Sequence, residues 1–166
     1  YKHFLGEQFG GGVIFELWKD TLGIEHGHIV DVIDISSSHI WSNVNQELIG
    51  RKAENPTDGI TNSNAIVAQN GHSNSAALIC KNSTNGGQND WYLPSIKELN
   101  SLWNNYFVVE KTLYQISGST QLTKGSYWSS TEYLDFTAWY FYFDDGDSYG
   151  NDNKDATYRV RAIRSF

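Results

Sequence analysis

The chain has little of several residue types that organise other classes of protein. Its 166 residues include two prolines, no methionine and one cysteine, Cys80. A single cysteine cannot close an intrachain disulfide, and it cannot supply the several thiolates of a usual zinc site. We therefore expect no covalent or metal framework and a buried, unreactive Cys80. Because methionine is absent and the sequence begins at Tyr1, we also expect an excised domain or a processed product.

Long apolar runs and basic charge are also scarce. No apolar stretch approaches the roughly 20 residues of a membrane span, and no signal-peptide pattern is present. Nineteen acidic residues against twelve basic ones give a net charge of −7 and a pI near 5.1. This charge has the wrong sign for nucleic acid or anionic lipid. The sequence thus argues against a nucleic-acid partner and against membrane insertion.

Aromatic side chains are abundant. The chain holds ten tyrosines, eight phenylalanines and six tryptophans. Such residues give rigid packing and are typical of recognition surfaces, where they supply contact area at a low cost in entropy. No internal repeat and no flexible linker divides the sequence, so we expect one domain over residues 1–166.

The order of predicted elements indicates an α+β fold. Residues 13–18 and 29–35 read as a strand hairpin with its turn at Leu22 and Gly23, and residues 61–69 and 73–81 read as short helices. Three further strands are expected over residues 127–131, 138–143 and 158–163. Strands, then helices, then strands imply an antiparallel sheet with flanking helices.

A third helix has the strongest local signal. Ser95 and Glu98 have the spacing of a capping box. Its expected apolar face comprises Ile96, Leu99, Leu102, Trp103 and Tyr106.

In the strand near Trp139, alternation assigns one face to the core and leaves the other free. Trp139, Phe141 and Phe143 share the core face. Tyr140 and Tyr142 point outward.

Several runs carry a resemblance to a known family. They are Gly10-Gly11-Gly12-Val13-Ile14-Phe15, His26-Gly27, Asp90-Trp91-Tyr92-Leu93-Pro94-Ser95 with Glu98-Leu99, Tyr127-Trp128-Ser129-Ser130-Thr131-Glu132, Ala138-Trp139 and Arg159-Val160-Arg161-Ala162-Ile163-Arg164. Over nearly the whole chain these runs resemble the C-terminal domain of bacterial collagen-like adhesins. The resemblance implies a C-type-lectin-type fold: a small twisted antiparallel sheet, flanking helices and long loops. Trimers occur among such relatives, so an oligomer stays open.

Formylglycine-generating enzymes share a related scaffold. Their chemistry depends on a cysteine pair, and this chain has Cys80 alone. Ser129 and Ser130, as possible nucleophiles, have no evident histidine and aspartate partners in the sequence. We expect a protein that is not an enzyme.

Residues 133–157 resemble the variable region of a diversity-generating retroelement protein. There, adenine-directed mutagenesis of Asn codons can yield many residue types, but never Met, Trp, Lys, Gln or Glu. In this stretch only Trp139 and Lys154 fall outside the reachable set, and both fit fixed framework positions. Six aspartates and one lysine give the stretch a charge of −5.

The expected binding site is the face formed by this stretch. Its candidate residues are Tyr133, Asp135, Phe136, Tyr140, Tyr142, Asp144, Asp145, Asp147, Tyr149, Asn151, Asp152, Asn153 and Asp155. The sequence predicts a non-catalytic, extracellular module, on a cell or virion surface, that binds a cell-surface protein or glycan. The alternative is an undiversified adhesin domain that binds carbohydrate, with sulfated glycans disfavoured by the acidic charge.

Single features of the sequence also suggest a metal site or a sugar-binding platform. No cofactor is expected. Calcium stays a possibility because aspartates cluster at residues 144–147, although the spacing is not that of an EF-hand loop. His26 and His28 alternate onto one strand face but lack a third metal ligand. Trp91, Trp103 and Trp128 could form a sugar platform, yet burial is the commoner fate of such tryptophans.

Overall fold

The N-terminal hairpin expected from the sequence forms the centre of the first of two sheets. In the computed structural model, which describes residues 1–166, this sheet is antiparallel and has the order β1-β2-β3-β9. Its strands are β1 (Gln8–Phe9), β2 (Gly12–Lys19), β3 (Glu25–Asp31) and β9 (Ile163–Ser165). The carboxylate of Asp20 accepts hydrogen bonds from the N–H groups of Leu22 and Ile24. Together with Gly23, whose φ is 77°, these bonds close the hairpin turn.

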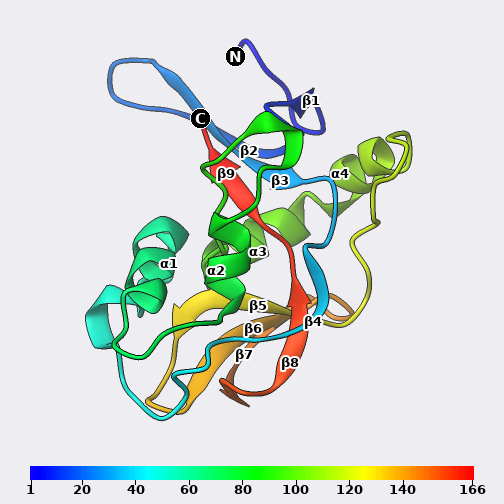
Figure 1. The fold of residues 1–166 in the computed structure, drawn as a ribbon. Helices are drawn as coiled ribbons and strands as arrows, with labels where there is room; N and C mark the ends of the chain where they lie inside the picture. The colour runs from blue at the N-terminus through cyan, green and yellow to red at the C-terminus, as the bar shows by residue number, and fades with distance from the viewer.

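The second sheet, in the lower part of Figure 1, has five strands in the order β4-β8-β5-β6-β7. Within it, β5 and β8 pair in parallel. Its strands are β4 (Ser36–Ile40), β5 (Ser126–Glu132), β6 (Thr137–Tyr142), β7 (Asp147–Asn153) and β8 (Thr157–Val160). One continuous strand over residues 158–163 was expected, and this is wrong. The chain leaves the second sheet at Val160 and enters the first at Ile163. β7, an edge strand, occupies a stretch in which the sequence predicts no strand.

Four α-helices lie in the chain between β4 and β5, which are both strands of the second sheet. The helices are α1 (Gly59–Val67), α2 (Ala76–Lys81), α3 (Ile96–Asn104) and α4 (Tyr106–Leu113), with 3-10 turns at Gly50–Lys52 and Asn85–Gly87. The predicted capping box of Ser95 and Glu98 is confirmed at the start of α3. The helix ends at Asn104, two residues before the expected Tyr106, because Asn105 leaves helical geometry and Tyr106 begins α4. None of the helices is both long and apolar enough to cross a membrane.

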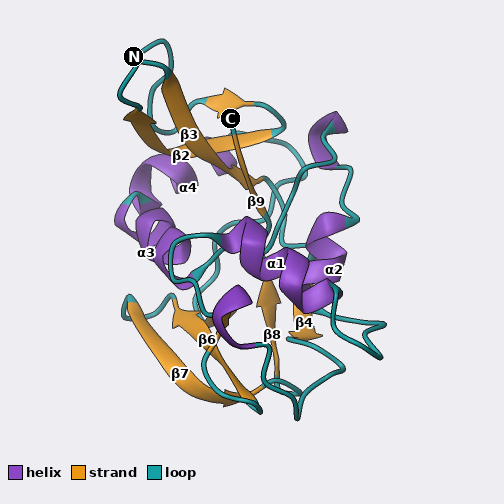
Figure 2. Ribbon diagram, turned by 90° about the vertical axis from the view of Figure 1, so that its left-hand side faces the viewer, coloured by secondary structure: helices purple, strands orange, loops and turns teal.

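The helices and the two sheets enclose two apolar clusters. Figure 2 shows the sheets at opposite ends of the view with α1, α2 and α3 between them. The first cluster includes Val13, Phe15, Leu99, Leu102, Val109, Tyr127, Phe141 and Phe143. The second includes Ile14, Ile29, Trp41, Ile66, Cys80, Trp91, Trp128, Ala138 and Val160. The α+β prediction is therefore confirmed, and Cys80 is a buried free thiol as expected.

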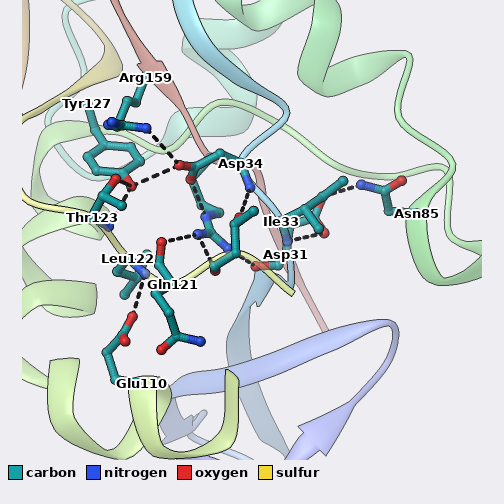
Figure 3. Close-up of polar contacts among 12 residues, drawn as sticks. Asp31, Ile33, Asp34, Asn85, Glu110, Gln121, Leu122, Thr123, Tyr127 and Arg159 are labelled. Atoms are coloured by element: carbon teal, nitrogen blue, oxygen red, sulfur yellow. Dashed lines mark hydrogen bonds and ion pairs between the residues drawn. The ribbon is translucent and has the colours of Figure 1, made fainter. Parts of the chain in front are cut away.

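A buried arginine joins the two sheets where the chain passes from β8 to β9. The guanidinium of Arg161 donates hydrogen bonds to the Asp34 carboxylate at 2.7 Å and to the carbonyls of Asp31 and Thr120 at 2.9 and 2.8 Å. Asp34 also accepts a hydrogen bond from the Tyr127 hydroxyl (Figure 3). Burial raises the pKa of Asp34 although two arginines face it. This network fixes the crossing of the chain between the sheets.

Candidate functional site

The thirteen candidate residues lie on or beside β6 and β7, and none of them is fully buried. Ten are exposed: Tyr133, Asp135, Phe136, Asp144, Asp145, Asp147, Tyr149, Asn151, Asn153 and Asp155. Tyr140, Tyr142 and Asp152 are half-buried. The outer end of the second sheet therefore exposes ten of the thirteen residues, while Tyr140 packs partly on the second apolar cluster.

The structure does not gather these residues on one face. The connection between β5 and β6 carries Tyr133 and Phe136 at one end of β6, whereas Asp144 lies in the β6–β7 turn at the other end. Tyr133 packs edge-on against Trp139, with ring centroids 5.2 Å apart. Alternation along β6 places Trp139 on the side opposite Tyr140. A ligand that covers Tyr140 would thus not contact the Tyr133 side of the sheet.

One group of aromatic rings remains, which we call the tyrosine face. Tyr140 of β6, Tyr149 of β7 and Tyr158 of β8 form its ring contacts, and alternation along β6 places Tyr142 on the same side. Tyr140 stacks on Tyr149 with an interplanar angle of 25° and a centroid distance of 5.5 Å. It lies 4.8 Å from Tyr158 on its other side. These contacts follow from the register, which pairs Tyr140 directly with Tyr149 across the two strands.

The tyrosine face rests on a buried tryptophan. The Trp128 ring is fully buried, lies 4.6 Å from the Tyr158 ring and meets Tyr140 edge-on. Its indole N–H donates a hydrogen bond of 2.8 Å to the His39 carbonyl, which fixes the ring. Tyr158 was not among the candidate residues. Tyr158 could have been predicted only from alternation along the final strand, which places its side chain opposite that of Arg159.

Aspartates hold the hydroxyl groups of this face. The Tyr149 hydroxyl donates a hydrogen bond of 3.4 Å to Asp145, and the Tyr158 hydroxyl donates one to Asp152. Burial, the Asp152 hydrogen bond and the Asp152 charge raise the pKa of Tyr158. Partial burial and the charge of Asp145 raise the pKa of Tyr149. Both phenols therefore stay protonated and neutral at physiological pH.

Trp139 belongs to the framework behind the tyrosine face. Its ring partly packs on the first apolar cluster. It also lies against Gly150, where an added Cβ would come within 2.8 Å of the indole. β7 carries a bulge at this point, because the residues from Tyr149 to Asp152 span a shorter segment of β6. The absence of a side chain at Gly150 therefore lets the edge strand close over Trp139.

Lys154 anchors the chain immediately after β7. Its ammonium group lies 2.6 Å from the Glu132 carboxylate, and both side chains are fully buried. It also donates hydrogen bonds to the carbonyls of Glu47 and Asp135 and lies over the Trp41 ring. This environment explains a lysine in a stretch otherwise rich in acidic and aromatic residues. The charge of Lys154 does not reach the surface.

The sequence runs that carry the family resemblance are mostly buried and structural. In β5, the Ser130 N–H donates to the Pro94 carbonyl at 2.7 Å, and the Thr131 hydroxyl accepts from the Ile96 N–H. The Ser129 hydroxyl donates to the Trp139 carbonyl. These bonds join β5 to the start of α3 and to β6. Trp91 and Trp128 are buried and cannot form a sugar platform.

The alternative metal and catalytic readings find little support in the geometry. No group of three or more His, Cys, Asp or Glu side chains is placed to hold a metal ion. His26 and His28 each face a carboxylate, Asp20 at 3.4 Å and Glu16 at 2.8 Å. The buried Ser130 hydroxyl accepts a hydrogen bond from an asparagine side chain rather than from a histidine.

Comparison with known proteins places the chain in a family. The model of the Lcl C-terminal domain matches residues 31–164, and no curated protein matches the chain. The structure is similar to a fimbrial protein from Bacteroides ovatus, with a TM-score of 0.68 and 17% sequence identity over 87% of this chain. The matched region covers 37% of that protein's length. The expected C-type-lectin-type fold is thereby confirmed, and the chain belongs to the Lcl C-terminal domain family.

Proposed function

We propose that this chain is a non-catalytic, extracellular ligand-binding module that acts on a cell or virion surface. The observation that carries the proposal is the tyrosine face: stacked, partly exposed rings held on a buried tryptophan and flanked by aspartates. Tyrosine and tryptophan are enriched at binding hot spots because they bury large areas with few rotatable bonds. Similarity of fold to a fimbrial protein supports the surface location.

The ligand on this proposal is a cell-surface protein or a glycan. Aromatic platforms bind both classes, since sugar rings and side chains can stack on the same surface. A glycan is the second candidate, favoured by the nearly parallel, partly exposed rings of Tyr140 and Tyr149. A cell-surface protein screen run beside a glycan array distinguishes an undiversified carbohydrate-binding adhesin from a protein receptor.

We further propose that residues 133–157 are diversified by a retroelement. Supporting this, the stretch is a hairpin with an edge strand, and its exposed positions make few contacts with the rest of the fold. The two residues outside the reachable set, Trp139 and Lys154, pack against the framework. The test is genomic: a near-identical template repeat beside a reverse-transcriptase gene, differing from the coding repeat only at adenines. Absence of such a repeat would refute diversification and leave the binding proposal intact.

The binding proposal is tested by removing the exposed ring of the tyrosine face. Tyr149→Ala should weaken binding of the ligand found in either screen by about tenfold, because loss of a hot-spot aromatic costs 1–2 kcal/mol or more. Phe107→Ala is the matched control, since Phe107 is an exposed aromatic on α4. Equal affinities of wild type and Tyr149→Ala, measured by calorimetry, would refute the site.

A further inference from the structure

The chemistry of the tyrosine face narrows the class of ligand. Tyr149 is the most exposed ring of this face, at 37%, whereas Tyr140 and Tyr158 are half-buried against the second apolar cluster. The polar groups around these rings are carboxylates: Asp145 beside Tyr149 and Asp152 beside Tyr158. A partner that binds at the exposed Tyr149 ring would therefore meet both a flat aromatic surface and the negative charge beside it.

The tyrosine face offers a ligand mainly hydrogen-bond acceptors. The hydroxyl protons of Tyr149 and Tyr158 are donated to Asp145 and Asp152, so these hydroxyls offer the ligand only lone pairs. The neighbouring Asp144 carboxylate raises the pKa of the Tyr142 hydroxyl. Carboxylates are acceptors only, and the face of an aromatic ring attracts cations. Donor groups and positive charge are therefore what this surface can satisfy.

The stretch that contains most of the tyrosine face is negatively charged. Residues 133–157 contain six aspartates and a single basic residue, Lys154. Lys154 is fully buried against Glu132 and does not offset these aspartates at the surface. The nearest arginine in sequence, Arg159, pairs with Asp34. The aspartates of residues 133–157 therefore lie beside the tyrosine face without a salt bridge to any basic side chain.

We infer that the occupant of the tyrosine face is a basic segment of a protein partner, with an arginine guanidinium stacked on the Tyr149 ring and hydrogen-bonded to Asp145. This inference rests on the proposed function and specifies its ligand. A guanidinium is planar and rich in donors, so it matches both the ring and the carboxylate beside it. Tyr140 and Tyr149 stack nearly parallel and do not form the cage that holds a quaternary ammonium. A neutral glycan could donate hydroxyl hydrogen bonds to the aspartates, but it would supply no positive charge to complement them.

The test uses a random 12-residue peptide library displayed against the whole 166-residue chain. Enriched peptides should carry net positive charge and arginine, and synthetic copies should bind about tenfold more weakly to Tyr149→Ala. Asp145→Asn with Asp152→Asn should weaken binding about tenfold at low salt, and less at high salt because exposed charges are screened. The charge-matched control is Glu47→Gln with Glu54→Gln, two exposed carboxylates in the loops around the Gly50–Lys52 turn.

The outcomes separate this inference from the proposed function. If the enriched peptides are neutral or acidic and still bind Tyr149→Ala more weakly, the inference of a basic partner is wrong, and the proposed binding site stands. Binding of a glycan to the tyrosine face with an affinity that does not depend on salt would also refute the basic partner and leave the binding site in place. Equal losses in the aspartate pair and in the control pair would also overturn the inference. If peptides bind the wild type and all face variants equally, both proposals fail.

Discussion

At the scale of single residues, buried and exposed ion pairs have different roles in this chain. The Lys154–Glu132 pair is fully buried and hydrogen-bonded on several sides. The Arg164–Asp90 pair joins β9 to the loop before Trp91, and half of the Asp90 side chain is exposed. Because desolvation makes a buried unpaired charge costly, the first pair controls stability far more than the second.

Lys154→Met should strongly destabilise the protein. The substitution leaves the Glu132 carboxylate buried without its cation, which typically costs about 3–5 kcal/mol of unfolding free energy. Denaturant unfolding measures this loss. Lys97→Met is the control, since Lys97 is exposed, and it should change stability by no more than about 0.5 kcal/mol. A loss below about 1 kcal/mol for Lys154→Met would contradict the anchoring role.

The Arg164–Asp90 pair predicts a small dependence of stability on pH. Two hydrogen bonds from Arg164 lower the pKa of Asp90 in the folded state. Stability from a lowered carboxyl pKa is present above the unfolded value, near pH 4, and is lost as pH falls through the folded pKa. Asp90→Asn should therefore cost at most about 0.5 kcal/mol at pH 7 and nothing at pH 2. The cost should vanish in an Arg164→Gln background, and a cost that grows on acidification would contradict the argument.

At the scale of elements, β7 shows how pairing can override local propensity. Its seven residues include Gly, Ser, Asp and Asn, which are poor strand formers, so the sequence gives no strand signal there. Pairing with β6 makes it a strand, and a bulge beside Gly150 fits it around Trp139. The capping box at Ser95, in contrast, was readable because all its groups lie within one helical turn.

Gly150→Val tests the contact between β7 and Trp139. A Cβ at this position would come within 2.8 Å of the indole ring, so strand or ring must move. Overpacking of this kind costs about 1–3 kcal/mol. Thermal unfolding should show the loss for Gly150→Val but not for Ser148→Val, whose side chain is exposed on the same strand. Equal melting temperatures for the two variants would show that β7 does not depend on this contact.

At the scale of the whole molecule, the residues that hold the fold and those that face solvent are separate sets. The runs that carry the family resemblance join β5, α3 and β6 through buried hydrogen bonds. The exposed positions of β7 and its turns contribute little to either apolar cluster. Exposed residues can thus change while the framework stays the same, which is the physical requirement of the proposed diversification.

Combined substitution of exposed positions should leave stability almost unchanged. Asp147→Ala, Asn151→Ser and Asp155→Ser together should alter the unfolding free energy by no more than about 1 kcal/mol, which corresponds to about 2–4 °C in a protein of this size. Calorimetric melting measures the shift. A fall of more than about 10 °C would show that this surface supports the fold.

The sequence by itself determined the α+β class, the hairpin of β2 and β3, the start of α3 and the alternation along β6. Each of these depends on short-range patterns of apolar residues, caps and turns. It also indicated which stretch is exposed to solvent. Only the tertiary structure decided which tyrosines stack together, that Tyr133 lies on the other side of the sheet, and that Tyr158 joins the tyrosine face. Strand order and register, set by pairing between distant segments, control those contacts, and no local pattern records them.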